Sequence, residues 1–259
     1  MDLGIKGKRA LVCGSSKGLG LGCATALAEA GVDIILNARS EADLFDSAKS
    51  IKASYEVDVQ IAVGDITSEK DRKSVMLLAG DIDILITNSG GPPPGTWNDW
   101  DNLDFLAALE ANMLTPIALM KQFLPKMMQK GWGRIINITS QSVKAPIPTL
   151  GLSNSARAGL TGYVAGTSRQ VAHSGVTINN LLPGGHQTDR IKNLLNVTSA
   201  EQGVSVEKLK KNMELGIPAK RLGTIEEFGA VCAFLCSIHA SYIVGQNILV
   251  DGGAVNATI

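Results

Sequence analysis

The sequence predicts a single α/β domain, a doubly wound parallel sheet of seven strands with helices on both faces. Short β-branched apolar runs alternate with longer helical stretches along all 259 residues. Several of these runs are apolar without alternation, as strands covered on both faces are. No linker, internal repeat or low-complexity tract divides the chain, so we expect one domain over residues 1–259.

Composition excludes several classes of protein. The 24 Lys and Arg residues balance the 24 Asp and Glu residues, which argues against nucleic-acid binding, and 45% apolar residues exclude a disordered chain. The four cysteines form no CxxC pair and have no histidine cluster beside them, so no metal site is expected. We find no signal-peptide pattern and no run of about 18 apolar residues. A cytoplasmic protein with no membrane partner is predicted.

Each predicted strand is a short run rich in Val, Ile and Leu. The strands are expected at Arg9–Cys13, Asp33–Asn37, Val59–Val63, Ile82–Thr87, Arg134–Thr139, Thr177–Leu181 and Asn247–Val250. The helices are expected between them, at Leu19–Glu29, Glu41–Ala53, Glu69–Leu78, Trp100–Gln129, Ser153–Ser174 and Ile225–Cys236. Thr224 and Glu227 have the spacing of a capping box at the start of the last helix.

A charged segment between Leu182 and Gly223 interrupts the alternation and has short helices of its own. It follows the sixth strand at the carboxyl edge of the sheet, where open α/β folds bind ligands. We predict that residues 189–220 form a substrate lid. The alternative is a charged surface excursion.

A glycine-rich turn comes directly after the first strand and leads into a helix. Glycines allow the backbone to turn sharply and to approach a pyrophosphate, which then meets the amides of the helix N-terminus. The pattern in this βα context predicts a dinucleotide site. Its residues are Gly14, Ser15, Ser16, Lys17, Gly18, Leu19 and Gly20.

The end of the second strand indicates which dinucleotide is bound. An acid there accepts the ribose hydroxyls of NAD, whereas a basic residue accepts the 2′-phosphate of NADP. Ala38 stands where the acid could be, Arg39 follows it, and Lys17 adds a second cation near the same corner. We therefore expect NADP(H) to be preferred to NAD(H).

Seven motifs in order span more than two hundred residues. They are Gly14–Gly20, Gly64-Asp65-Ile66, Asn88-Ser-Gly-Gly91, Asn112, Gly133–Ser140, Pro183-Gly184 with Thr188, and Gly245-Gln246 with Asp251–Gly253. Together they resemble the classical short-chain dehydrogenase/reductase family, and within it the β-ketoacyl carrier-protein reductases. The resemblance implies a Rossmann fold, a small-molecule carbonyl or alcohol substrate, and a homotetramer or homodimer.

The resemblance also implies roles for individual residues. Ser140 is expected to be the active-site serine, and Asn112 is expected to be the asparagine of the catalytic tetrad. The cofactor contacts expected outside the glycine loop are Arg39, Asp65, Ile66, Asn88, Ser89, Gly90, Arg157, Pro183, Gly184, His186 and Thr188.

The chain departs from this family where the family has Tyr-x-x-x-Lys. Counting from Ser140 leads to Ser153 and Arg157, four residues apart on one helix face. The pKa of a tyrosine is about 10, and a neighbouring cation can lower it so that the phenol protonates an alkoxide. A serine hydroxyl is far too weak an acid for this role. The Arg157 guanidinium can still donate to ribose hydroxyls, although it cannot shuttle a proton.

Other residues could supply the proton. His186 falls beside the expected nicotinamide site and titrates near neutrality, although a surface loop histidine is the alternative. Lys144 lies on the substrate side, four residues after Ser140, and could act if it is desolvated. We rank these two residues as the acid candidates.

Two functions remain open. The first is an NADP(H)-dependent oxidoreductase in which Ser140 holds the carbonyl oxygen, Asn112 holds a relay water and Arg157 holds the nicotinamide ribose. The second is a catalytically silent member of the family that binds the cofactor as a partner subunit or a redox-cofactor sensor. The glycine loop is compatible with both, retention of Ser140 and Asn112 favours the enzyme, and the loss of the tyrosine favours the silent protein.

Overall fold

A computed structural model describes residues 1–258 and shows one parallel sheet of seven strands in the order β3-β2-β1-β4-β5-β6-β7. The strands are β1 (Arg9–Cys13), β2 (Asp33–Ala38), β3 (Val59–Val63), β4 (Ile84–Thr87), β5 (Gly133–Ile138), β6 (Val176–Pro183) and β7 (Asn247–Val250). This confirms the predicted fold class. The predicted fourth strand began two residues too early, because residues 82 and 83 precede the ladder with β1 and β5.

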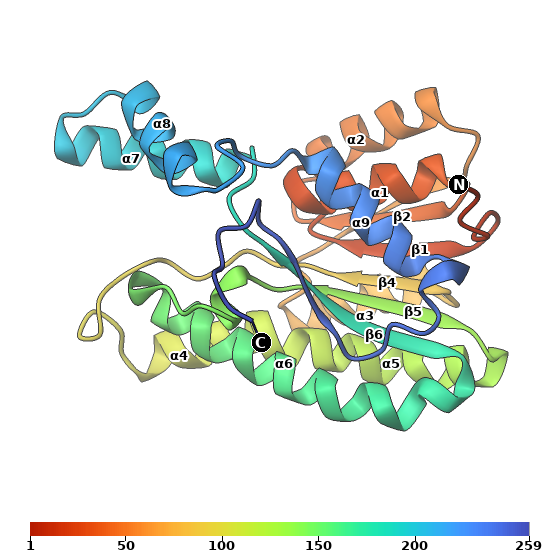
Figure 1. Ribbon diagram of the computed structural model, residues 1–259. Coiled ribbons are helices and arrows are strands. Elements are labelled where there is room, and N and C mark those ends of the chain that lie inside the picture. Colours follow the sequence, from red (N-terminus) through yellow and green to blue (C-terminus); the bar gives the residue numbers. More distant parts are fainter. Residues whose placement is uncertain (259) are drawn as a thin grey trace.

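Helices cover both faces of the sheet (Figure 1). One layer contains α1 (Gly18–Glu29), α2 (Glu41–Ser54) and α9 (Ile225–Cys236). The other contains α3 (Glu69–Ala79), α5 (Thr115–Lys130) and α6 (Gly151–Val171). The nearly uninterrupted burial of the central strands follows from this double cover.

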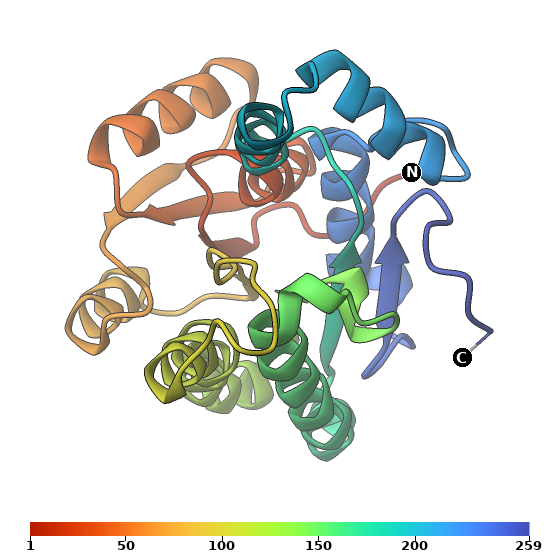
Figure 2. The same cartoon turned by 90° about the vertical axis from the view of Figure 1, so that its left-hand side faces the viewer.

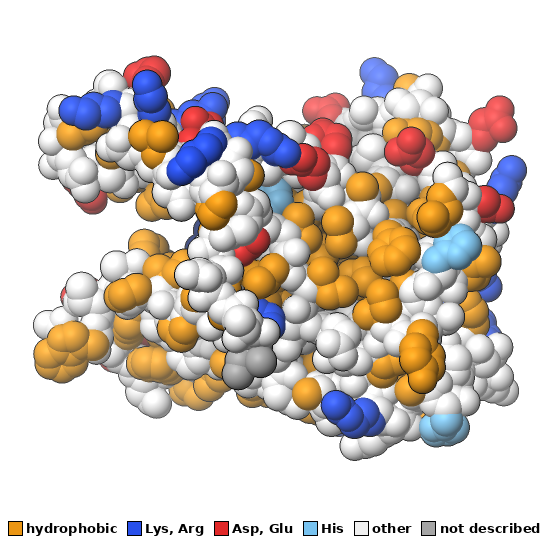
Figure 3. Space-filling view, viewed as in Figure 1, with side chains coloured by type: hydrophobic (Ala, Val, Ile, Leu, Met, Phe, Trp, Pro, Cys, Tyr) orange, Lys and Arg blue, Asp and Glu red, His pale blue; other side chains and the backbone are white. Residues whose placement is uncertain are grey.

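The carboxyl ends of the strands form one edge, and the strand order reverses there between β1 and β4. Helices α7 (Asp189–Gln202) and α8 (Val206–Gly216) project beyond this edge on the side of α1, opposite α4 (Asn102–Leu109) (Figures 1 and 2). Figure 3 shows a hollow between these two projections. The charged segment predicted as a lid therefore stands beside an open cleft.

The helix predicted at residues 100–129 is divided into three parts. It begins at Asn102, since Asp101 and Asp104 form a capping box there. A π-helical turn, Glu110–Leu114, then separates α4 from α5. Such a turn inserts one extra residue into the helical period, which an apolar pattern alone does not show.

The combined helix from Asn102 to Lys130 is long and apolar enough to cross a membrane by length and composition. Its α5 part, however, buries Leu119, Phe123 and Met127 against the sheet. These three side chains therefore belong to the core of the protein.

The ends of α6 and the start of α9 can be compared with the predicted helices. Helix α6 begins at Gly151, two residues before the predicted start, and its last turn is a 3₁₀ turn over Ala172–Ser174. Thr224 and Glu227 form the predicted capping box at the start of α9. The side chain of Thr224 accepts from the Glu227 amide, and Glu227 accepts from the Thr224 amide.

Candidate cofactor and active site

The glycine loop between β1 and α1 has the shape of a phosphate site. Gly14 and Gly18 take φ angles of 57° and 60°, which residues with a Cβ rarely adopt. A Cβ at Gly20 would lie 2.2 Å from the carbonyl oxygen of Gly14. No side chain among residues 1–258 caps α1, so its first amides are free to bind an anion. The loop therefore fits the pyrophosphate of a dinucleotide.

Two residues predicted to contact the cofactor use their side chains to hold this loop. Ser15 is fully buried, and its Oγ donates to the Val12 carbonyl at 2.7 Å and accepts from the Asn37 amide at 3.0 Å. Asn88 Nδ2 donates to the Gly14 carbonyl at 3.1 Å. These side chains position the loop, and the cofactor contacts of the two residues stay predictions.

Ser16 and Leu19 of the loop contact the first helical layer and the core beneath it. The carbonyl of Ser16 accepts from Ser47 Oγ of α2 at 2.9 Å. The side chain of Leu19 is half-buried and packs against the core on this face of the sheet. The outer part of the loop is thus held by α2 and by the core, and its amides are left for a ligand.

The predicted cationic corner has two acids beside it. Arg39 Nη1 lies 4.0 Å from Asp65 Oδ2, and Lys17 Nζ lies 3.7 Å from Asp189 Oδ2 at the start of α7. Partial burial raises the pKa of Asp65, but two hydrogen bonds from Thr67 and the charge of Arg39 hold it below its ordinary value. Both ion pairs are exposed and therefore weak, so a phosphate could replace Asp65 as the partner of Arg39.

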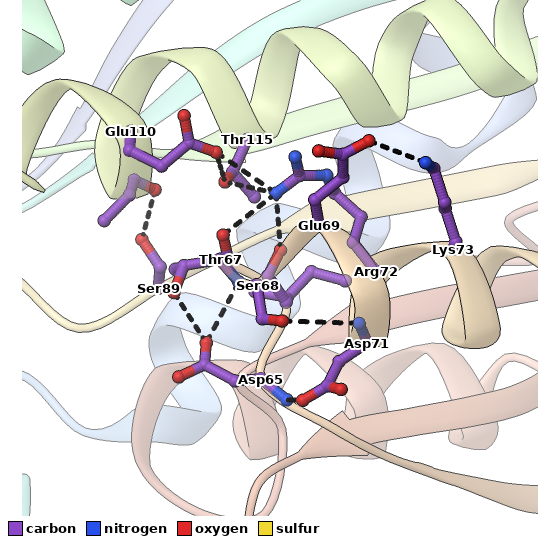
Figure 4. A network of polar contacts seen from close by, with 12 residues as sticks. Asp65, Thr67, Ser68, Glu69, Asp71, Arg72, Lys73, Ser89, Glu110 and Thr115 are labelled. Atoms are coloured by element: carbon purple, nitrogen blue, oxygen red, sulfur yellow. Dashed lines mark hydrogen bonds and ion pairs between the residues drawn. The ribbon is translucent and has the colours of Figure 1, made fainter.

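A polar network connects the Asp65 loop to the π turn (Figure 4). Arg72 of α3 is 8% exposed, and its Nη1 donates to the carbonyls of Ile66 and Thr67 at 3.1 Å. The same nitrogen contacts Glu110 Oε1 at 3.2 Å and Thr115 Oγ1 at 3.1 Å. Arg72 thus couples the loop expected at the adenine to the turn that carries Asn112.

The π turn places Asn112 at the head of a small pocket. Asn112 is 2% exposed, its Nδ2 lies 3.4 Å from the Ala108 carbonyl, and its Oδ1 has no partner among the described residues. Ser89 Oγ donates to the Ala111 carbonyl at 2.9 Å and supports the turn. The pocket is lined by Cys13, Ile66, Thr87, Asn88, Ser89, Ala111, Asn112, Thr115, Pro116, Leu119, Ile138, Arg157 and Leu160.

Gly90 contacts Asn112 at this pocket, and Cys13 lines it. Nδ2 of Asn112 lies 3.5 Å from the carbonyl of Gly90, which begins the exposed glycine- and proline-rich loop after β4. Burial raises the pKa of the Cys13 thiol to about 12, so this cysteine is a neutral part of the floor.

Ser140 lies two residues after the end of β5. It is half-buried, and its Oγ accepts from the Ser142 amide at 3.1 Å. This contact begins the 3₁₀ turn Gln141–Val143 and orients the hydroxyl oxygen. The hydroxyl proton is bound to no acceptor among residues 1–258, so it is available to a carbonyl oxygen.

Ser153 and Arg157 contact each other on the first turns of α6. Arg157 Nε donates to Ser153 Oγ at 3.2 Å, and its Nη1 donates to the Ile138 carbonyl at 2.8 Å. Both side chains are buried, at 5% and 7% exposure. Burial, with a smaller effect from the charge of Arg190, lowers the pKa of Arg157 to about 10. Arg157 is therefore still a cation at neutral pH.

The turn after β6 lies next to the glycine loop, as the nicotinamide contacts require. Pro183 ends β6, and the Gly184 amide donates to the Val250 carbonyl at 3.0 Å. The methyl carbon of Thr188 lies 3.7 Å from the position of a Cβ built on Gly18. Thr188 thus stands over the glycine loop at the N-terminus of α7.

The two acid candidates differ in their surroundings. Lys144 is half-buried at the end of the 3₁₀ turn after Ser140, and its Nζ forms no ion pair among the described residues. His186 is 3% exposed, its Nδ1 lies 3.2 Å from the Gly184 carbonyl, and its ring packs edge-on against Phe228 at 5.3 Å. Burial lowers the pKa of His186, although the Gly184 carbonyl and the charges of Glu227 and Asp251 oppose it. A buried neutral imidazole is a poor acid, so this placement disfavours His186 as the proton donor.

The buried imidazole of His186 makes stability depend on pH. Its folded-state pKa is below the unfolded value of about 6.5, so the unfolded chain binds more protons in this range. The contribution of neutral His186 is complete above pH 6.5 and is lost as the pH falls toward the folded-state pKa. Urea unfolding of the wild type and His186→Gln from pH 8 to 5 should therefore show a steeper fall for the wild type. The exposed His173→Gln variant should follow the wild type, and parallel curves for His186→Gln would contradict the prediction.

Sequence reasoning missed two side chains at this edge. Arg190 lies in the first turn of α7, where a Cβ built on Gly91 would come 2.3 Å from its Nη1. Gln141 Oε1 is buried without a partner among the described residues, and it lies 2.9 Å from a Cβ position on Gly184. Arg190 could have been noticed as a cation two residues after Thr188, but nothing in the local sequence indicated Gln141.

The chain and its fold have counterparts among known proteins. The family model described as enoyl-(acyl carrier protein) reductase matches residues 14–255. The NADPH-dependent reductase BacG of Bacillus subtilis is 31% identical over 255 residues, which cover 96% of this chain and 98% of that protein. The 3-oxoacyl-[acyl-carrier-protein] reductase FabG of Aquifex aeolicus is 31% identical over 259 residues, covering 98% and 99%.

A solved structure agrees along the whole chain. L-sorbose reductase from Gluconobacter frateurii, complexed with NADPH and L-sorbose, superposes with a TM-score of 0.95 and 27% identity. The match covers 99% of this chain and 100% of that one. Together with the family model and the curated relatives, this match shows that the chain belongs to the short-chain dehydrogenase/reductase family.

Proposed function

We propose that the protein is an NADP(H)-dependent oxidoreductase that interconverts a carbonyl and an alcohol on a small molecule, as 3-oxoacyl reductases do, with an atypical proton donor. A small cavity supports the proposal, because Asn112, with its unpartnered Oδ1, and Arg157 both line it, together with Asn88, which holds the glycine loop. Relatives described as NADPH-dependent reductases and as a D-beta-hydroxybutyrate dehydrogenase support this reaction class.

Each side chain then has one task. NADPH held at the glycine loop and by Arg157 would supply the hydride that the carbonyl carbon accepts. The Ser140 hydroxyl donates to the carbonyl oxygen and stabilises the charge that develops there. Asn112 Oδ1 accepts from a relay water, and that water or Lys144 delivers the proton that the new alkoxide takes up. In this assignment Ser153 has no acid role, because a serine hydroxyl is far too weak an acid, and its oxygen accepts from Arg157.

The preference for NADP(H) rests on Arg39 and on the absence of an acid at Ala38. Replacing Arg39 by Gln should weaken NADPH binding about 10- to 100-fold, because a charge-assisted bond to the 2′-phosphate is lost. Binding of NADH should change little. Fluorescence titration of both cofactors measures this, with the exposed Lys52→Gln variant on α2 as the control. An equal loss for NADPH and NADH would contradict the assignment.

One observation favours the silent protein as a second candidate. The residues that line the pocket include no tyrosine, and Ser153 is bound to Arg157. A protein that binds NADPH but transfers no hydride could act as a partner subunit or a redox-cofactor sensor. The two functions share the cofactor site and differ only in turnover.

The deciding experiment is NADPH oxidation by the purified protein with a panel of ketones, aldehydes and β-ketoacyl thioesters. Turnover of any panel member supports the enzyme. NADPH binding without turnover supports the silent protein. Failure to bind either NADPH or NADH would exclude both.

We also propose that residues 189–220 are a substrate lid and that the protein is a cytoplasmic homotetramer or homodimer. Leu194 and Val197 of α7 are 43% and 56% exposed, which leaves apolar surface on the lid. Leu103 and Leu106 of α4 are 71% and 53% exposed, which is typical of a surface covered by another subunit. Light scattering of the purified protein measures the subunit number.

A further inference from the structure

Arg72 is a buried cation that makes four polar contacts through one nitrogen. The side chain is 8% exposed, and its Nη1 lies 3.1–3.2 Å from four acceptors on two separate parts of the fold. Two of them are the carbonyl oxygens of Ile66 and Thr67, in the loop after β3. The others are Glu110 Oε1, on the first residue of the π turn, and Thr115 Oγ1, on the residue that follows it. One nitrogen therefore holds the loop and the turn together (Figure 4).

The four acceptors share the hydrogens of that nitrogen. A guanidinium Nη nitrogen carries two N–H bonds, so it cannot give each of the four oxygens a hydrogen bond of its own. A shared hydrogen bond is bent and therefore weaker than a linear one. If the loop moves away from Nη1, both hydrogens are left to Glu110 and Thr115, and a movement toward Nη1 has the opposite effect. The position of the loop thus sets how firmly the π turn is held.

The other side of the loop is connected to the expected 2′-phosphate site. Arg39 Nη1 lies 4.0 Å from Asp65 Oδ2, and Asp65 Oδ1 accepts from the amide and the hydroxyl of Thr67, at 3.0 and 2.7 Å. When a phosphate replaces Asp65 as the partner of Arg39, the carboxylate loses its cation and keeps its bonds to Thr67. The carbonyl of Thr67 is one of the four acceptors of Arg72. A ligand at Arg39 therefore acts on the loop that Arg72 holds.

The π turn connects Arg72 to the pocket. It carries Asn112, whose Oδ1 is buried without a partner among the described residues. Ile66 and Thr115, which both contact Arg72 Nη1, line the same pocket as Asn112. Turns of this π type are frequent at functional sites. A change in how Arg72 holds Glu110 and Thr115 therefore changes the position of residues that line the pocket.

We propose that Arg72 is a positioning residue, which transmits binding of the adenosine half of the cofactor to the π turn that places Asn112. The Arg72 link is the name used below for this chain of contacts, which consists of Arg39, Asp65, Thr67, Arg72 and Glu110. The inference rests on the proposed function for the place of the 2′-phosphate. It goes beyond that function, because it makes one half of the cofactor set the geometry on the far side of the Asp65 loop.

The test uses 2′,5′-ADP, which is the adenosine half of NADP without the nicotinamide. Hydrogen exchange of the purified full-length protein, followed by mass spectrometry, reports on the amides of Glu110–Leu114. In the wild type, saturating 2′,5′-ADP should slow exchange there about 5- to 100-fold, which is the usual range of coupling between two sites. The amides of α9, in the other helical layer, are the internal reference and should slow less. Calorimetry establishes saturation for each variant.

Two variants interrupt the Arg72 link at different contacts. Glu110→Ala removes one acceptor on the π turn, and Arg72→Lys keeps the charge but replaces the planar fork by a point charge. Both should still bind 2′,5′-ADP, and the slowing at Glu110–Leu114 should fall about threefold or more. Lys73→Gln is the matched control, because it removes an exposed ion pair with Glu69, at 2.6 Å, from the next residue of α3. It should keep the wild-type slowing.

Each other outcome overturns the Arg72 link. Failure of 2′,5′-ADP to bind overturns it, and so does exchange at the π turn that the ligand leaves unchanged. Equal slowing in α9 and in the π turn shows general stabilisation by the ligand and has the same consequence. Full slowing in Glu110→Ala and Arg72→Lys assigns Arg72 a structural role only. The side chain of Glu110 is 42% exposed, so Glu110→Ala tests the proposal even where Arg72→Lys does not fold.

Turnover measurements keep this proposal apart from the proposed function. Slowed exchange at the π turn without NADPH oxidation by any substrate of the panel supports the Arg72 link and rejects the reductase. NADPH oxidation by a protein whose π turn does not respond to 2′,5′-ADP supports the reductase and rejects the Arg72 link. Where both hold, Glu110→Ala should lower kcat about tenfold with a smaller change in the KM for NADPH, because Asn112 is then misplaced.

Discussion

The double variant Ser153→Tyr/Arg157→Lys should reduce uncharged ketones about 10²- to 10⁴-fold faster than the wild type. The change restores a phenol whose pKa a neighbouring lysine can lower, and general acid catalysis contributes rate enhancements of this size. The two positions are four residues apart and already contact each other through Arg157 Nε and Ser153 Oγ, so the new pair is placed on the same helix face. NADPH oxidation with acetone and cyclohexanone measures the effect.

The matched control is Ser155→Tyr/Arg169→Lys, which makes the same exchanges at exposed positions of α6. It should leave the rates at the wild-type level. A double variant that keeps the wild-type melting temperature and binds NADPH, yet shows no gain with uncharged ketones, would mean that the missing tyrosine is not what limits this chemistry.

Ser140→Ala should lower kcat about 10²- to 10³-fold with a smaller change in KM. The hydroxyl is placed to donate to the carbonyl oxygen, and that bond strengthens as negative charge develops in the transition state. Loss of one preorganised donor of this kind has an effect of this size. Steady-state kinetics with the best substrate of the panel separates kcat from KM.

Ser142→Ala is the control for this variant. Ser142 lies two residues further on, and its buried hydroxyl has no hydrogen-bond partner among the described residues. Its removal should leave kcat near the wild-type value. Ser140→Ala also removes a cap of the 3₁₀ turn, which lowers stability by about 1 kcal/mol, so activity is compared well below the melting temperature. Equal kcat losses in the two variants would assign Ser140 a structural role.

The fold was predictable because its signals are local. Apolar runs with β-branched residues marked the strands, and the glycine spacing after the first strand marked the phosphate loop. The positive φ angles of Gly14 and Gly18 are the physical reason for that spacing. The helix predicted at residues 100–129 was wrong in detail, since a π turn changes the backbone register without changing the apolar pattern.

The sequence predicts a candidate site at the carboxyl edge of the sheet, but it does not show which groups its side chains contact. The side chains of Asn88 and Ser15, for which cofactor contacts are predicted, hold the glycine loop from inside the protein. His186 was expected beside the nicotinamide, and its ring packs on Phe228 of α9. These side chains have partners from other elements, which no local pattern encodes.

The sequence by itself determined the α/β class, the glycine-rich loop after the first strand and the four-residue spacing of Ser153 and Arg157. Only the tertiary structure decided what these two side chains contact. It buries Arg157 between Ser153 and the Ile138 carbonyl and brings Arg190 of the lid to Gly91, far away along the chain. Periodicity and spacing follow from backbone geometry, whereas the pairing of charges depends on which distant elements pack together.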